Sequence, residues 1–177
     1  RDSFARTYAQ PEPDLVADFV LDGVARIMRS KNGRRAGGIG IAIPSEMWNW
    51  SALIGLPTPR MDGWRDLKLA EQIAAVSGLP VYTRNDATAA CGAELMFGTA
   101  DLPADFLHLY FGYFIGGGLV LNNHLYDGPS GNAGAIGSMP IGWDGRPRQL
   151  IELASIHVLE RGLPDGQILT DSGDWDI

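Results

Sequence analysis

Apolar residues spaced three or four positions apart predict several amphipathic helices in the first half of the chain. The clearest stripe runs through residues 14–30, where Asp14 is a plausible N-cap. A further stripe predicts a helix over 66–78, and residues 86–98 predict a helix that Asp86 caps. Each of these two ends at a glycine, a residue that readily closes a helix because it tolerates the left-handed conformation.

Short apolar segments between these helices predict strands over 37–44 and 79–85. The resulting order alternates helices with strands, which requires crossover connections and indicates a largely parallel sheet in an α/β fold. The first strand is followed by a loop over 45–64 that contains three tryptophans. A loop of this length inside a compact domain is usually functional or disordered, and its aromatic content argues against disorder.

The pattern changes after residue 104. Residues 105–128 predict two strands across a glycine run, then the pair Asn122–Asn123 and a third short strand, which together form a β-meander. A glycine-rich loop is expected over 129–147, and the last clear apolar stripe predicts a helix over 148–162.

Composition narrows the classes of function. A net charge of −7 and a pI near 4.8 disfavour direct contact of this chain with nucleic acid or a membrane surface, since phosphate contact needs clustered Lys and Arg. The sequence has no apolar run long enough to span a membrane and no signal peptide. The single cysteine, Cys91, excludes an intrachain disulfide and suits a reducing cytoplasm. The chain does not begin with Met, so the sequence leaves open that it is a fragment.

The best catalytic candidate is Asp86, which follows Asn85 at the end of a predicted strand. This position puts both side chains at the carboxyl edge of the sheet, where open α/β sheets bind ligands. There the carboxylate could accept the proton of a substrate hydroxyl during phosphoryl transfer, while Asn85 holds a neighbouring hydroxyl. The alternative is structural, because Asp is among the best helix N-caps.

Other candidates have both functional and structural interpretations. The glycine-rich run over 112–118 could cradle phosphate, but its spacing favours a hairpin whose glycines permit positive φ. The segment 131–138 is either a ligand-facing loop or a plain surface loop. The loop tryptophans could stack on a sugar, although covering the core is the more usual role; they are Trp48, Trp50 and Trp64. Cys91 is expected to be buried packing, and the three histidines form no visible zinc set.

Taken in order, these segments resemble the ROK family (repressor, open reading frame, kinase). The family has a strand ending in Glu-Asn-Asp-Ala-Asn-Ala-Ala, a Gly-Thr-Gly-Ile-Gly-Gly-Gly run and a Gly-x-x-Gly-x-Ala-Gly-Glu-Ile-Gly-His stretch. The matching segments here are "RNDATAACGAELMFG", "YFGYFIGGGLVLNNHLYDG" and "GPSGNAGAIGSMPI". "GIGIAIPSEM" and "GWRDLKLAEQIAAVSGLPV" are similar to two further family segments, so the resemblance covers about 35–162.

The resemblance implies an actin/hexokinase-like (ribonuclease H-like) α/β fold, with two lobes around a cleft and with its N-terminal part lying before Arg1. We accordingly expect 1–85 to be the remainder of the N-terminal lobe and 86–177 to be the C-terminal lobe. The resemblance also implies a bacterial, cytoplasmic protein of carbohydrate metabolism. It makes Asp86 the catalytic base of a kinase and makes Asn85 and Asp86 sugar contacts.

Several departures from the family pattern bear on function. The Thr-Gly of the family's phosphate loop is Tyr113–Phe114 here, so the loop that these rings form with Gly112, Gly116, Gly117 and Gly118 is expected to be a degenerate nucleotide site. The sugar-binding Glu and the zinc- or sugar-binding His correspond to Ala135 and Ser138. The cysteine-rich zinc segment is absent, so we expect no zinc and no other metal.

Two functions follow from the resemblance. We favour a sugar-binding effector domain of a ROK-type transcriptional regulator without kinase activity, which needs no cofactor. The alternative is an ATP-dependent sugar kinase that transfers phosphate from MgATP to a hexose or N-acetylhexosamine hydroxyl. In both cases the expected partner is a small-molecule sugar. Since family members commonly form dimers, a homodimer is a candidate assembly. A third hypothesis is a degenerate family member that is kept only for structure or assembly and binds no ligand.

Overall fold

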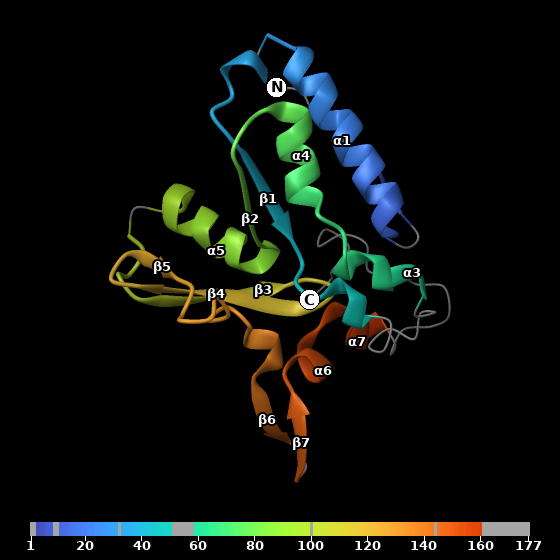
Figure 1. The fold of residues 1–177 in the computed structure, drawn as a ribbon. Coiled ribbons are helices and arrows are strands. Elements are labelled where there is room, and N and C mark those ends of the chain that lie inside the picture. Colours follow the sequence, from blue (N-terminus) through green and yellow to red (C-terminus); the bar gives the residue numbers. More distant parts are fainter. Residues whose placement is uncertain are drawn as a thin grey trace. The chain divides into compact units, whose positions relative to one another are not determined.

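The computed structural model contains two compact units, residues 1–85 and 86–177, which we call unit 1 and unit 2 (Figure 1). The structure describes residues 3–8, 11–31, 33–50, 59–99, 101–143 and 145–160. Within these ranges, no helix is both long enough and apolar enough to cross a membrane.

Unit 1 combines two long helices with a two-stranded parallel sheet (Figure 1). In chain order its elements are α1 (Pro13–Arg29), η1 (Gly33–Arg35), β1 (Ile39–Ile43), η2 (Met47–Asn49), α3 (Pro59–Asp62), η3 (Gly63–Arg65), α4 (Leu69–Ser77) and β2 (Val81–Asn85). The predicted helices 14–30 and 66–78 and strands 37–44 and 79–85 are therefore confirmed, as is the parallel pairing. Gly78 closes α4 in the left-handed conformation, with φ of 69°.

The apolar stripes of α1 and α4 meet and cover the sheet. Ala17, Leu69 and Ile73 are buried at this contact, and alternate residues of β1 pack against them. A second buried cluster consists of Met47, Met61 and Trp64. The Trp64 indole Nε1–H donates to the Pro11 carbonyl at 2.7 Å. This bond ties the segment before α1 to the short helices that follow β1.

Two local expectations in unit 1 are wrong. Asp14 is not the N-cap, because α1 begins at Pro13, whose fixed φ suits the first helical position, and Glu12 is the flanking residue. The segment 45–64 is not one continuous loop, since η2, α3 and the start of η3 lie in it; its residues 51–58 are outside the described ranges. Burial of Met47, Met61 and Trp64 stabilises these short helices.

Unit 2 consists of a helix on a three-stranded antiparallel sheet, followed by a hairpin and two short helices (Figure 1). In chain order its elements are α5 (Asp86–Phe97), β3 (Phe106–Phe111), β4 (Ile115–Leu121), β5 (His124–Tyr126), η4 (Ile136–Ser138), β6 (Pro140–Trp143), β7 (Arg146–Gln149), α6 (Ile151–Ala154) and α7 (Ile156–Glu160). The predicted helix 86–98 and the β-meander are confirmed. Asn122 and Asn123 form the second turn, with φ of 52° and 61°.

The three consecutive glycines lie inside β4 and not in its turn, and none of them has positive φ. The expectation that they supply positive φ to a hairpin is therefore wrong. Glycine is needed at these positions because other elements pack closely against both faces of the sheet. A Cβ at Gly116 would lie 2.8 Å from Cβ of Ala87, and one at Gly118 would collide with Cβ of Cys91, both on α5. On the other face, a Cβ at Gly117 would lie 2.8 Å from Cγ1 of Ile136.

The predicted helix over 148–162 is confirmed only in part, because the end of β7 and two separate short helices, α6 and α7, occupy this stretch up to residue 160. The helix is interrupted at Ser155, which is fully buried. Its hydroxyl donates to the Ile151 carbonyl at 2.8 Å and accepts from the Ile115 amide at 2.9 Å. One local and one tertiary bond of this side chain thus interrupt the helix that the apolar spacing predicts.

The loop predicted over 129–147 is likewise only partly a loop. It contains η4 and β6, and β7 begins within it. Strand β6 pairs with β7 in an antiparallel hairpin. The sequence does not predict this pairing, because both strands contain a proline and β6 also contains a glycine, and neither residue is typical of strands.

The packing of β4 predicts the effect of adding one methyl group. Gly118→Ala should lower the free energy of unfolding by about 1–3 kcal/mol, because the new Cβ has no space beside Cys91. Gly142→Ala in β6 is the matched control, since nothing lies within 4 Å of its Cβ position. Chemical denaturation followed by circular dichroism measures both. Equal effects of the two substitutions would contradict the packing explanation.

Candidate functional site

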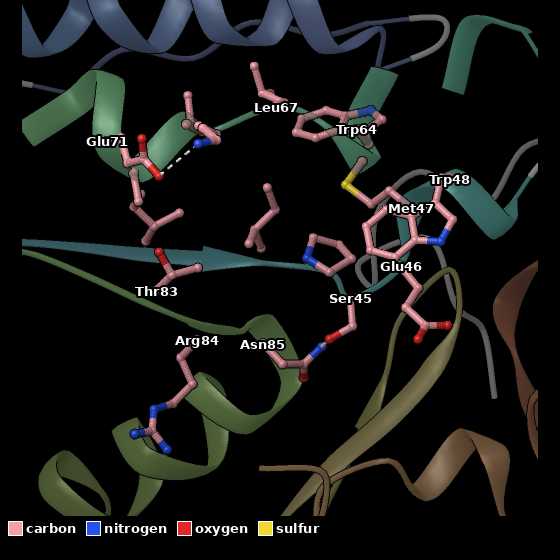
Figure 2. A pocket seen from close by; sticks show the side chains of 16 residues that line it. Ser45, Glu46, Met47, Trp48, Trp64, Leu67, Glu71, Thr83, Arg84 and Asn85 are labelled. Carbon is pink, nitrogen blue, oxygen red and sulfur yellow. Dashed lines mark hydrogen bonds and ion pairs between the residues drawn. The ribbon is translucent and has the colours of Figure 1, made fainter. Parts of the chain in front are cut away.

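A pocket of about 470 Å³ lies in unit 1 at the carboxyl ends of β1 and β2 (Figure 2). One side is formed by these strand ends and by residues that follow β1. The other side is formed by Trp64 and by the first turn of α4. The carboxyl edge of parallel strands is where open α/β sheets bind ligands, so this pocket is the candidate binding site of the unit.

Ser45 and Asn85 provide neighbouring polar groups in the pocket (Figure 2). The Asn85 amide Nδ2 donates to the Ser45 hydroxyl at 3.2 Å. The two residues come together because β1 and β2 are parallel, with Ile43 paired to Asn85 in register. Asn85 is one of the residues singled out in the sequence, whereas Ser45 was missed. Its signal was its place directly after the proline that ends the first strand.

The tryptophans that follow β1 belong mainly to the core, as expected. Trp64 is 8% exposed, and Trp48 and Trp50 pack against its cluster while remaining partly buried. Trp48 and Trp64 also line the pocket, together with Met47 (Figure 2). The Arg65 guanidinium carbon lies 5.7 Å from the centre of the Trp48 ring. Covering the core and lining a pocket are therefore compatible roles here.

Charged groups lie at the rim of the pocket. Lys68 Nζ and Glu71 Oε1 are 3.6 Å apart, and both side chains are more than 70% exposed, at 71% and 72%. Solvent screens an ion pair this exposed, so it contributes little to stability. Its charges remain accessible to a ligand in the pocket.

Asp86 is the first residue of α5 and belongs to unit 2. Its Oδ1 accepts a hydrogen bond from the Ala87 amide at 2.9 Å, so the carboxylate serves the amino end of the helix. Asp86 is not among the residues that line the pocket of unit 1. Its assignment as a catalytic base or a sugar contact stays a prediction.

The turn between β3 and β4 carries an aromatic cluster. The Tyr113 and Phe114 rings meet edge to face, with centroids 5.1 Å apart. The His157 ring lies 5.7 Å from Tyr113 and 5.0 Å from Phe114, measured between centroids. His157 Nδ1 is 3.1 Å from the Tyr113 carbonyl, which can only accept, so this nitrogen carries the proton.

Helix α7 holds the backbone of the same turn. The amide of Ile156 donates to the Gly112 carbonyl at 3.2 Å, and that of His157 donates to the Tyr113 carbonyl at 3.3 Å. The Ile115 amide donates to the Ser155 hydroxyl, as described above. A phosphate cradle presents free amide donors to an anion, and this turn uses the Ile115 donor internally. Degeneracy of the nucleotide loop nevertheless remains a prediction.

The two altered positions of the family pattern lie around η4. Ala135 directly precedes this short helix, and Ser138 is its exposed last residue. Across the part of the chain that the structure describes, no group of three or more His, Cys, Asp or Glu side chains is arranged to hold a metal ion.

Cys91 lies on the face of α5 that packs against β4, and it is fully buried. Burial raises the pKa of its thiol, and the nearby Glu94 carboxylate raises it further. The neutral thiol is therefore the stable form in the folded chain. Buried packing, the role expected for this residue, is confirmed.

Comparison with known protein families matches residues 4–151 to the family described as "ROK family". Among curated proteins, the chain is 30% identical over 135 residues to a xylose repressor of Bacillus subtilis, covering 75% of this chain and 34% of the repressor. It is 35% identical over 79 residues to a glucokinase of Halalkalibacterium halodurans, covering 45% of this chain and 24% of the glucokinase. The chain thus spans about a third of the length of the repressor.

Solved structures share the fold of this chain. A ROK family glucokinase from Streptomyces griseus, solved with glucose and AMPPNP, matches with a TM-score of 0.63 and 25% identity, over 88% of this chain and 50% of the glucokinase. A ROK family transcriptional regulator, a homologue of the Escherichia coli MLC protein, matches with a TM-score of 0.59 and 21% identity, over 85% of this chain and 39% of the regulator. These matches confirm the actin/hexokinase-like α/β class.

Because Cys91 is buried, we expect its thiol to be unreactive in the folded protein. In the native protein at pH 8 we expect dithiodipyridine to label Cys91 slowly, and one thiol per chain to react at once in guanidinium chloride. Ser130→Cys, at an exposed position of unit 2, is the matched control and should add one fast-reacting thiol. Fast labelling of the native, unsubstituted protein would show that α5 does not pack on β4 as described.

Proposed function

The chain belongs to the ROK family, and from this we propose that it is the sugar-binding effector domain of a ROK-type transcriptional regulator without kinase activity. The observation that carries the proposal is the pairing of Asn85 with Ser45 in the pocket of unit 1. Asn85 matches the family's sugar-contacting residue, and its amide both donates and accepts hydrogen bonds. Together with the Ser45 hydroxyl, it offers two adjacent partners for vicinal sugar hydroxyls.

The relatives support a regulator more than an enzyme. Several of the similar curated proteins are xylose repressors, and glucokinases are also present. Because this chain spans only about a third of the repressor, DNA contact in a regulator would fall to other parts of a longer protein. The acidic composition of this chain is consistent with that division.

The alternative function is an ATP-dependent sugar kinase with Asp86 as the general base. The retained Asn85–Asp86 pair favours it, since a carboxylate beside a bound hydroxyl is what phosphoryl transfer requires. The turn between β3 and β4 counts against it. Tyr113 and Phe114 stand where the family's kinases have Thr-Gly, and the two rings pack with His157 instead of leaving bare backbone for phosphate.

We propose further that the ligand is a free or substituted sugar, that MgATP is not a cofactor, and that the protein acts in the cytoplasm. The pocket needs no metal for sugar binding, because amide and hydroxyl groups are sufficient partners for sugar hydroxyls. A homodimer is compatible with this function but is not required for it.

Thermal unfolding tests sugar binding. D-xylose or D-glucose in excess should raise the melting temperature, by an amount corresponding to about 2.7 kcal/mol at 100 times Kd. Asn85→Ala should weaken binding about tenfold by removing one hydrogen-bonding side chain. Asn132→Ala, at an exposed position of unit 2, is the matched control and should leave binding unchanged. The proposal would be wrong if pentoses, hexoses and N-acetylhexosamines all left the melting temperature unaltered.

A further inference from the structure

The walls of the pocket in unit 1 differ strongly in polarity. Ser45 is exposed and Asn85 is half-buried, and together they form a polar group at the carboxyl ends of the strands. Met47 and Trp64 are only 6% and 8% exposed, and with Trp48 they form the part that we call the apolar wall (Figure 2). The polar pair is therefore accessible from solvent, while the apolar wall is mostly buried.

A free monosaccharide finds hydrogen-bond partners in only one of these two regions. It carries hydroxyl groups around its ring, and each hydroxyl that enters an apolar environment without a hydrogen-bond partner loses free energy. Ser45 and Asn85 can partner such groups, whereas the side chains of Met47 and Trp48 cannot partner them through their apolar surfaces. At about 470 Å³, the pocket falls within the range typical of drug-sized ligands and leaves room beyond one sugar ring.

The apolar wall is held in position by bonds outside the pocket. The Trp64 indole is fixed by its hydrogen bond to the Pro11 carbonyl, and Met47 packs in the same buried cluster. Arg65 lies over the Trp48 ring. A wall fixed in this way presents apolar surface without having to rearrange, which lowers the entropic cost of binding an apolar group.

We propose that the preferred ligand is a glycoside whose aglycone is aromatic or aliphatic. This inference rests on the proposed function and names the ligand class of the same site. The sugar ring binds to Ser45 and Asn85, and the aglycone lies against Met47, Trp48 and Trp64. Hydrogen bonds then select the sugar, while burial of the aglycone supplies most of the affinity.

Isothermal titration calorimetry tests this inference with seven probes: D-xylose, D-glucose, phenol, and both anomers of phenyl xyloside and of phenyl glucoside. For the sugar that binds, we expect one anomer of the phenyl glycoside to bind at least tenfold more tightly than the free sugar. Trp48→Ala should remove most of this gain, measured as the ratio of the affinity for the phenyl glycoside to the affinity for the free sugar. Trp50→Ala is the matched control, since Trp50 packs against the same cluster but does not line the pocket.

The outcomes separate this inference from the function on which it rests. If the free sugar binds and neither phenyl anomer binds more tightly, the aglycone inference is wrong and sugar binding stands. The same holds if Trp48→Ala and Trp50→Ala reduce the gain equally. If phenol alone binds as tightly as the phenyl glycoside, the pocket is a general apolar site and the inference is wrong. If no sugar and no glycoside binds, the proposed function and the inference both fail.

Discussion

The parallel pairing of β1 with β2 determines where the pocket of unit 1 lies. Parallel strands need a crossover, and here α4 supplies it while covering the sheet with its apolar side. The same pairing brings both carboxyl ends to one edge, so that Ser45 and Asn85 meet at 3.2 Å. The short helices after β1 then close the pocket with an apolar wall that is part of the core. The polar residues of the candidate binding pocket and the apolar residues of the core are thus adjacent in unit 1.

Unit 2 depends on a different constraint, the close approach of α5 and η4 to the two faces of β4. Glycine at three successive positions permits this approach, and Ser155 and α7 then fix the neighbouring turn by hydrogen bonds. A glycine run that resembles a phosphate loop in sequence therefore has a complete explanation in packing. Its retention in this chain is not by itself a sign of nucleotide binding.

The sequence predicted the elements whose signals are local. Helices α1 and α4 follow from apolar spacing, closing glycines mark the ends of α4 and α5, and the paired asparagines predict the turn before β5. Features that depend on distant contacts could not be predicted in this way. The break at Ser155 arises from a bond to Ile115, 40 residues away, and the glycines of β4 are explained only by α5 and η4. Asn85 was singled out from its place at a strand end, whereas the meeting of Ser45 with Asn85 and the position of the apolar wall beside them depend on the folded pocket.

We propose that this chain binds a sugar in unit 1 and does not use MgATP. Nuclear magnetic resonance of the ¹⁵N-labelled protein, titrated first with D-xylose or D-glucose and then with MgATP, tests it most directly. We expect the sugar to shift the signal of the Asn85 side-chain amide, and we expect MgATP then to shift nothing and to yield no sugar phosphate. Shifts at Gly112, Tyr113 and Phe114 on addition of MgATP, with sugar phosphate accumulating, would contradict it and identify the chain as part of a kinase.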